Sequence, residues 1–146
     1  MPLVRISVFE NTDAEKKKAI ASAVYDAMRS TLNIPENDRF VILTTHSHDD
    51  LSVDPHFMGM QRTNDFVLAH VTLRRGRSVE TKQSFYKEVV RLFAERAGIA
   101  PDDVMIVLSE NELADWSFGR GEAQYVSNQT QSTFTPAGST MIGEPR

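Results

Sequence analysis

A proline follows the first methionine, at the head of the segment LVRISVF. Pro2 has no N–H to donate to a β-sheet, and the first residue of a strand is one of the few sheet positions that tolerates a proline. If Met1 is removed, however, Pro2 becomes a secondary amine, and an α-amino group titrates near pH ~8. Such an amine can act as an acid or a base near neutral pH, and its adduct with an aldehyde or ketone is an electron-accepting iminium cation. The start of a strand and a catalytic amine therefore both explain this residue.

Two arginines, Arg75 and Arg77, follow the apolar segment DFVLAHVTL. If that strand persists to residue 77, their spacing places both side chains on one face of the sheet. Two guanidinium groups can then hold one carboxylate through charge-assisted hydrogen bonds. A solvated basic strand end is the simpler explanation of RRGR taken by itself.

Asp38 lies in the segment PENDRF, just ahead of a predicted strand. A carboxylate close to the Pro2 nitrogen would favour the ammonium form and raise the pKa of that amine, and it could take a proton from water. A local turn held by the aspartate side chain is the alternative. Asp103 occupies a similar segment, which favours the turn for both residues.

Three aromatic residues, Trp116, Phe118 and Tyr125, cluster with Gly119 and Gly121 in ADWSFGRGEAQY. Most aromatic side chains fill cores, but this grouping after the last predicted strand is more typical of a pocket wall than of a helix face.

A metal site receives little support. His46, His48, Asp49 and Asp50 are close together, but two histidines in a polar segment are more typical of a surface loop. The chain has no cysteine, so it has neither a thiolate nucleophile nor a cysteine-ligated metal. We predict neither metal nor cofactor.

The same order of strand, helix, breaker and strand occurs twice, in residues 2–45 and 67–110, at an offset of 65 residues. The predicted strands are 3–9, about 39–45, 65–73 and 104–108. The first helix is expected to begin at Thr12, in a capping box with Glu15, and the second at Ser78. Identical residues at this offset are Glu15 and Glu80, Val24 and Val89, Ile34 and Ile99, Asp38 and Asp103, and Leu43 and Leu108. The matching order indicates an internal duplication.

Two β-α-β units predict an α/β (α+β) fold with a four-stranded sheet and two helices on one face, each crossover making its strands parallel. The other sheet face carries Val and Ile residues that must be buried, so we predict self-association. We interpret 1–127 as one domain, with a polar loop or short hairpin after residue 45. Residues 128–146, rich in Ser, Thr, Gln, Gly and Pro, are a C-terminal arm, either disordered or packed on a neighbouring subunit.

Composition restricts the class of protein. The chain has 146 residues, 40% apolar and 25% charged, as is typical of a globular domain. Its net charge of −4 gives no support to nucleic-acid binding. No apolar run approaches the ~18 residues of a membrane span, and no signal peptide is recognisable. We expect a cytoplasmic protein without membrane or nucleic-acid partners.

The ordered set of motifs resembles the tautomerase superfamily, and within it the malonate semialdehyde decarboxylase group, over roughly residues 2–127. The motifs are MPL at the start, PENDR, the Arg-x-Arg pair before the second helix, GIAPDDV and ENELADWSFGRGEAQ. The resemblance implies a homotrimer of tautomerase-type subunits built around an N-terminal proline. It implies catalytic roles for Pro2, Asp38, Arg75 and Arg77, and substrate binding by Arg75, Arg77, Trp116, Phe118 and Tyr125. Gly76 stands where the family has proline, and the C-terminal arm is longer than the family norm.

The implied activity is cofactor-independent decarboxylation of malonate semialdehyde to acetaldehyde and carbon dioxide, with promiscuous hydratase activity. Tautomerisation of 2-oxo acids, and hydration or dehalogenation of 3-haloacrylates, are alternatives for the same residues. A non-catalytic trimeric binding protein would instead retain Met1. A stand-alone binder of acidic substrates would use Arg75 and Arg77 but would explain neither Pro2 nor the aromatic cluster.

Overall fold

The computed structural model describes residues 1–127. It consists of two units, Met1–Glu110 and a second that begins at Asn111. The first unit contains both copies of the repeat. The predicted arm, 128–146, lies outside the described residues.

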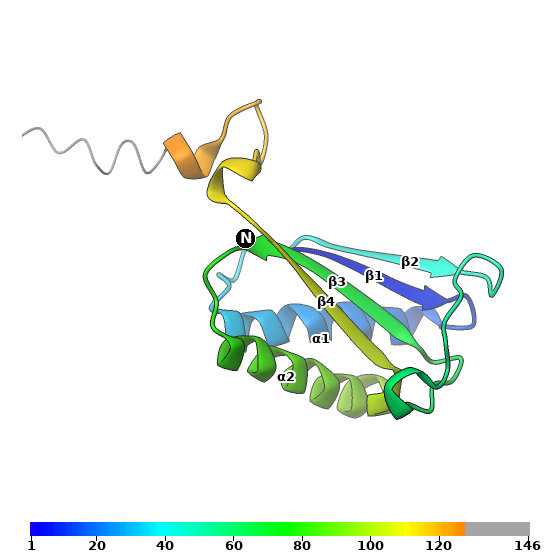
Figure 1. The fold of residues 1–146 in the computed structure, drawn as a ribbon. Helices are drawn as coiled ribbons and strands as arrows, with labels where there is room; N and C mark the ends of the chain where they lie inside the picture. Colours follow the sequence, from blue (N-terminus) through cyan, green and yellow to red (C-terminus); the bar gives the residue numbers. More distant parts are fainter. Residues whose placement is uncertain (128–146) are drawn as a thin grey trace, which may run out of the picture. The chain divides into compact units, whose positions relative to one another are not determined.

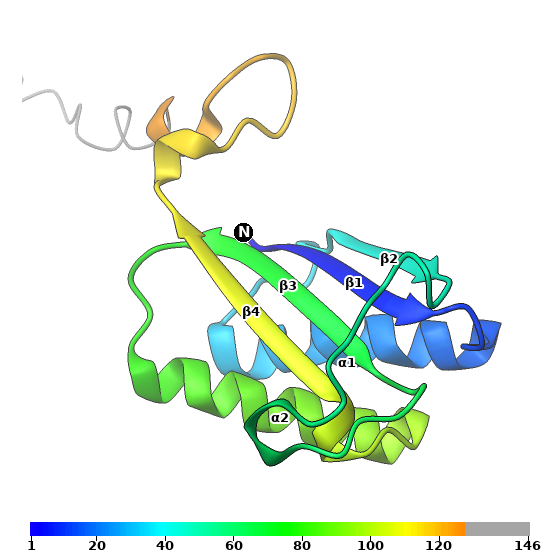
Figure 2. The ribbon, with the colours of Figure 1, turned by 45° about the vertical axis from the view of Figure 1, so that its right-hand side comes forward.

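Four strands form one mixed sheet, with two helices on one of its faces (Figure 1). The strands are β1 (Leu3–Phe9), β2 (Val41–His46), β3 (Val67–Arg74) and β4 (Val104–Asn111), in the order β2-β1-β3-β4. β1 runs parallel to β2 and antiparallel to β3, and the arrows of β3 and β4 point the same way (Figure 2). The predicted fold is confirmed, because each β-α-β crossover produces a parallel pair.

The two helices occupy equivalent positions in the sequence repeat. α1 (Ala14–Leu32) and α2 (Val79–Ala97) have 19 residues each, and their bounds differ by the offset of the sequence repeat. Their C-caps, Asn33 and Gly98, both adopt the left-handed conformation that ends many helices. Within residues 1–127, no helix combines the length and the apolar character that a membrane span needs.

The N-cap prediction is confirmed for α2 and wrong for α1. Ser78 caps α2 by accepting a hydrogen bond from the Thr81 N–H at 3.2 Å. In α1 the cap is Asp13, which accepts from the Lys16 N–H at 2.8 Å. Thr12 is not the cap because its hydroxyl donates instead to the Phe9 carbonyl, at 2.8 Å.

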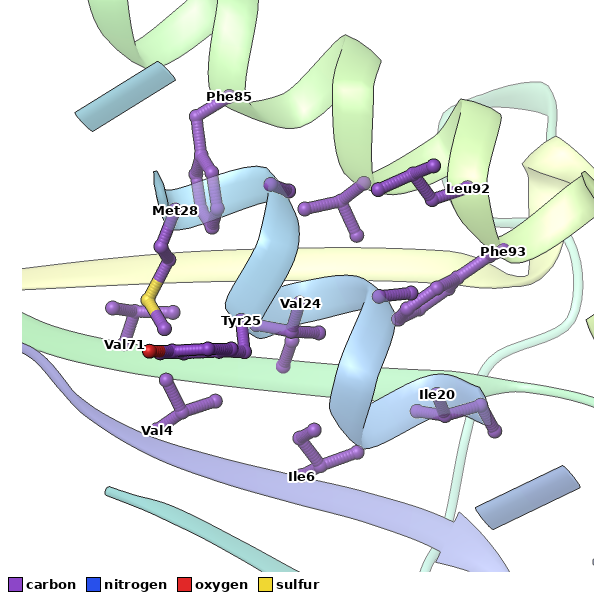
Figure 3. Close-up of a cluster of buried hydrophobic side chains, with 14 of the residues drawn as sticks. Val4, Ile6, Ile20, Val24, Tyr25, Met28, Val71, Phe85, Leu92 and Phe93 are labelled. Carbon is purple, nitrogen blue, oxygen red and sulfur yellow. The ribbon is translucent and has the colours of Figure 1, made fainter. Parts of the chain in front are cut away.

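The core lies between the helices and the inner face of the sheet (Figure 3). α1 contributes a stripe at helical spacing, and α2 faces it with large aromatic side chains. The fully buried residues that Figure 3 labels are Val4, Ile6, Ile20, Val24, Met28, Val71, Phe85 and Phe93. This packing fixes the β1 and β3 ends that carry the candidate site.

Among residues 1–110, both helices lie on the same face of the sheet, and none covers the outer face (Figure 1). Alternate residues of β2 and β4 point to this face, and Ile42, Met105 and Val107 are 41%, 41% and 38% exposed. Between β2 and β3 the chain forms a long loop with one short 3₁₀ helix, η1 (Phe57–Gly59), instead of a hairpin. The uncovered apolar face agrees with the sequence prediction.

Candidate active site

The N-terminal amine and Asp38 lie at the same end of the sheet. The Val4 N–H donates to the Phe40 carbonyl at 2.9 Å, which draws the segment before β2 alongside the start of β1. As a result, the Met1 nitrogen is 3.9 Å from Oδ2 of Asp38. Pro2 is buried, and Asp38 is only 8% exposed.

Burial dominates the electrostatics of this pair. It lowers the pKa of the Met1 amine, against the opposing pull of Asp38, and the positive charges of Arg77 and Arg74 lower it further. Burial also raises the pKa of Asp38, although the nearby amine opposes this. Asp38 raises the pKa of the Met1 amine, but the net pKa of that amine is lowered. Both groups are therefore shifted toward their neutral forms. The effect of Asp38 on a Pro2 amine stays a prediction.

Asp103, the repeat partner of Asp38, has a hydrogen-bond donor for each of its carboxylate oxygens. Its two oxygens accept hydrogen bonds from the N–H and the hydroxyl of Thr63, both at 2.6 Å. Thr63 lies 40 positions earlier in the chain, so this bond anchors a distant loop rather than a local turn. Among the described residues, Oδ1 of Asp38 is buried without a hydrogen-bond partner. A buried, unsatisfied carboxylate oxygen beside an amine distinguishes the first repeat from the second.

The arginines do not lie on a continuing strand. β3 ends at Arg74, and Gly76 turns the chain with a φ of +127°, so the condition under which Arg75 and Arg77 would share one face of the sheet is not met. The Arg77 guanidinium folds back and donates to the carbonyls of Arg74, at 3.2 Å, and Leu32, at 3.5 Å. The latter is the C-terminal end of α1, where a cation is favourable.

These residues surround a small hollow. A cavity of about 320 Å³ is lined by Leu32, Arg74, Arg75, Gly76 and Arg77. With three arginines in its wall, the cavity has a positive lining that would favour an anion such as a carboxylate.

Sequence reasoning missed Arg74. In the β1–β3 register Leu3 pairs with Thr72, so Arg74 falls opposite Met1, and its charge acts on the terminal amine. An antiparallel pairing of the two repeats' first strands would have pointed to this residue.

Glu110 was also missed, and it interacts with Arg75. A hydrogen bond from Lys82 lowers the pKa of Glu110, and the charges of Lys82 and Arg75 and the Gly76 N–H lower it further. The carboxylate of Glu110 therefore anchors the turn that carries Arg75 and Gly76.

The three predicted aromatic residues belong to the second unit and contact one another. The Trp116 and Phe118 rings stack with centroids 5.8 Å apart, and Tyr125 meets Phe118 edge-on at 5.1 Å. The Trp116 indole N–H donates to Oδ1 of Asn111 at 2.8 Å. Their clustering is observed, and their place beside Pro2 stays a prediction from the sequence.

The histidines that invited a metal interpretation have other contacts. His46 hydrogen-bonds the Thr44 hydroxyl at 3.0 Å, and the His48 ring stacks on Phe9 with centroids 4.1 Å apart. Within residues 1–127, no three potential metal ligands of the His, Cys, Asp and Glu types gather.

Comparison with known proteins gives consistent matches. Two family models, each described as a tautomerase enzyme, match residues 38–119 and 2–60. The probable tautomerase YrdN of Bacillus subtilis (strain 168) is 31% identical over 88% of this chain and 99% of its own length.

Solved structures extend the comparison. FG41 malonate semialdehyde decarboxylase, inhibited by 3-bromopropiolate, is 41% identical with a TM-score of 0.81, over 87% of this chain and 96% of its own. A second malonate semialdehyde decarboxylase, described with decarboxylase and hydratase activities, is 33% identical with a TM-score of 0.81, over 87% and 98%. A fused 4-OT symmetric trimer is 22% identical with a TM-score of 0.70, over 85% and 98%, and shares the fold.

The two aspartates provide a matched test of the site. We expect Asp103→Asn to lower the free energy of unfolding by about 1–3 kcal/mol, because the Thr63 N–H and hydroxyl lose a charged acceptor. Asp38→Asn should raise that free energy at neutral pH, because the ionised carboxylate is disfavoured by burial. Urea unfolding of both variants at pH 7 measures the difference.

The pH dependence of the free energy of unfolding tests the direction of the Asp38 effect independently. The native pKa of Asp38 is raised above its ordinary 3.8, so its destabilising effect should appear as pH rises through the raised pKa and vanish below 3.8. The gain from Asp38→Asn should disappear in acid. A loss of stability in Asp38→Asn equal to that in Asp103→Asn would contradict the distinction between the two sites.

Proposed function

The chain belongs to the tautomerase superfamily of enzymes, and we propose that it decarboxylates a small 3-oxo acid without a cofactor, using Pro2 after removal of Met1. Malonate semialdehyde, converted to acetaldehyde and carbon dioxide, is the proposed substrate. The observation that carries the proposal is the place of the N-terminus: the Met1 amine lies 3.9 Å from the buried carboxylate of Asp38, the next residue is the buried Pro2, and Arg74 and Arg77, whose charges act on that amine, line a nearby cavity. The likeness to two malonate semialdehyde decarboxylases supports the choice of reaction.

The proposed reaction begins with the substrate carboxylate on the arginines and its aldehyde carbonyl at the Pro2 amine. The protonated amine polarises the carbonyl, or the amine adds to it as an iminium. The bond between the carboxylate carbon and C2 then breaks, its electron pair moves toward the carbonyl carbon and the electron sink, and carbon dioxide leaves. A proton then adds to C2 and gives acetaldehyde. Where an iminium has formed, its hydrolysis releases the acetaldehyde from Pro2.

The arginines serve this reaction by orientation. They stabilise the charged carboxylate of the ground state, so a tighter grip does not by itself accelerate its loss. Their contribution is to hold the breaking C–C bond perpendicular to the carbonyl plane. We propose that Arg74 joins Arg75 and Arg77 in this role, because its charge acts on the terminal amine.

Asp38 favours the protonated form of the Pro2 amine and, in a side reaction, activates water for hydration. The sequence resemblance also assigns an apolar wall to Trp116, Phe118 and Tyr125. Such a wall would disfavour the localised charge of the carboxylate more than the dispersed charge of the transition state.

Tautomerisation of a 2-oxo acid is the second candidate. A tautomerase uses its amine as a base, which must be neutral. The burial and the arginine charges that lower the pKa of the Met1 amine would also favour a neutral Pro2 amine, and the relative YrdN is described as a probable tautomerase.

A homotrimer is the proposed assembly. Its support is the exposed apolar face of the sheet, with Ile42, Met105 and Val107, and the shared fold with a fused 4-OT described as a symmetric trimer. Covering that face removes apolar surface from water.

Pro2→Ala tests the central step. We expect kcat/KM for malonate semialdehyde to fall by ~10²–10⁴-fold, because a primary amine with a different position and basicity replaces the secondary amine. Proton NMR of acetaldehyde formation measures the rate. Intact mass of the wild-type protein comes first: retention of Met1 would leave Pro2 as an amide and favour the non-catalytic binding protein.

Single Arg→Gln variants test the carboxylate site. Loss of a charge-assisted hydrogen bond should lower kcat/KM by roughly 10–100-fold in Arg74→Gln, Arg75→Gln and Arg77→Gln. Arg91→Gln is the matched control, because Arg91 lies on the exposed surface of α2 with Glu88 and Glu95. Unchanged KM and kcat in all three site variants would refute carboxylate binding by this cluster.

The pH–rate profile separates the two reactions. The burial and the arginine charges that lower the pKa of the Met1 amine should act in the same direction on the Pro2 amine once Met1 is removed, so a decarboxylation that needs the cation should slow as pH rises through that lowered pKa. Tautomerisation of a 2-oxo acid should accelerate over the same interval. Asp38→Asn removes the group that raises the amine pKa, so both profiles should move to lower pH. If neither pH–rate profile shifts in Asp38→Asn, the N-terminal amine is excluded as the titrating group.

A further inference from the structure

The carboxylate of Asp38 is placed by the backbone that carries it. Among the described residues, its Oδ1 is buried without a hydrogen-bond partner. Its Oδ2 lies 3.9 Å from the Met1 nitrogen, which is beyond the length of a hydrogen bond. Within residues 1–127, the distance between the carboxylate and the amine therefore depends on how the segment between α1 and β2 is held.

A tyrosine of α1 contacts that segment on both sides of the aspartate. The Tyr25 hydroxyl donates a hydrogen bond to the carbonyl of Glu36, two residues before Asp38. The guanidinium of Arg39, the residue after Asp38, lies over the Tyr25 ring, 5.2 Å from its centroid, as in a cation–π contact. One side chain therefore joins α1 to the residues that flank the carboxylate.

The tyrosine is itself held in the core. Tyr25 is only 8% exposed, and it belongs to the buried cluster that includes Val4 and Val71 (Figure 3). Side chains in a close-packed core keep one position. The Tyr25 hydroxyl is therefore a fixed point to which the segment is bonded.

The turn that contains the aspartate is common to both repeats. The Asp38 N–H donates to the Pro35 carbonyl at 3.2 Å, and the Asp103 N–H donates to the Ala100 carbonyl at 3.0 Å. The two bonds are equivalent at the offset of 65 residues. The fold thus forms this turn in both places, whatever residues contact it from the helix.

The tyrosine and its arginine occur in the first repeat and not in the second. Val90 and Val104 stand at the positions equivalent to Tyr25 and Arg39. In the second repeat, Asp103 is held through its own carboxylate oxygens. A buried tyrosine usually finds a partner for its hydroxyl, but the fold does not require a tyrosine here. The pair is found only where the aspartate lies beside the N-terminal amine.

We propose that Tyr25 is a positioning residue, which holds Asp38 beside the N-terminal amine. It acts through the Glu36 carbonyl and the Arg39 guanidinium. The inference rests on the proposed function for its catalytic consequence, whereas the placement of the carboxylate can be measured without turnover.

The charge of the carboxylate gives the measure of its placement. Asp38 raises the pKa of the Met1 amine, and the charges of Arg77 and Arg74, at the end of β3, lower it. The same charges should act in the same directions on a Pro2 amine. Asp38→Asn should therefore lower the pKa of the N-terminal amine. The size of that fall reports how closely the carboxylate is held, because Coulomb energy decreases with distance.

NMR titration of the N-terminal amine nitrogen in the full-length protein measures this fall, after intact mass has established the first residue. In the Tyr25→Phe background, Asp38→Asn should lower the amine pKa by at most about half as much as in the wild type, because the released segment lets the carboxylate move away. Tyr86→Phe is the matched control. Tyr86 lies on α2 with its ring centroid 6.1 Å from that of Phe85, and its variant should keep the full effect of Asp38→Asn.

A full effect of Asp38→Asn in the Tyr25→Phe background would overturn the proposal, even if urea unfolding shows that Tyr25→Phe is less stable. If Tyr25→Phe does not fold, Arg39→Lys decides by the same comparison. A lysine keeps the charge but lacks the planar guanidinium that lies over the ring, and Arg39 is exposed.

The decarboxylase assay separates this proposal from the proposed function. A reduced effect of Asp38→Asn in Tyr25→Phe, in a protein whose wild type does not decarboxylate malonate semialdehyde, would refute the proposed reaction and leave the role of Tyr25 intact. An active wild type with a full effect in Tyr25→Phe would refute the role of Tyr25 alone.

Discussion

The site depends on holding an amine and a carboxylate together where burial disfavours the charge of each. At 3.9 Å the two groups attract, but the loss of water around them is the larger effect, so the pKa of the amine is lowered and that of the acid is raised. The charges of Arg74 and Arg77 reinforce the change at the amine. A bound anion would offset those positive charges, which couples substrate binding to the protonation state of the amine.

The two repeats place the same residue type, an aspartate, in different surroundings. Asp38 and Asp103 occupy equivalent positions, and both are buried. Both carboxylate oxygens of Asp103 accept hydrogen bonds from Thr63, which anchors the loop before β3. Within residues 1–127, Asp38 has a buried oxygen without a hydrogen-bond partner, and its other oxygen lies 3.9 Å from the Met1 amine. The aspartate of the second repeat thus stabilises a loop, whereas that of the first has an unsatisfied buried acceptor.

The arginine cluster depends on the point at which β3 ends. Arg74 is the last residue of the strand and faces the amine, while Gly76 turns the chain so that Arg77 reaches back to the end of α1. Glu110 anchors the same turn near Arg75. Three neighbouring arginines therefore have three different surroundings, although all line one cavity.

Apolar periodicity and cap residues are local signals, and from them the sequence alone predicted β1, the start of each helix to within one residue, the duplication and the uncovered sheet face. The family resemblance came instead from the ordered set of motifs. The local signals could not decide between Thr12 and Asp13 as a cap, since both types accept from a helix N–H and the choice follows from Thr12 bonding Phe9. Only the tertiary structure distinguished Asp38 from Asp103, and placed Arg74 opposite the amine, because strand register and the donors around a buried carboxylate come from residues distant in the chain. Burial, which lowers the net pKa of the Met1 amine despite the nearby Asp38 carboxylate, is likewise a property of the packed molecule.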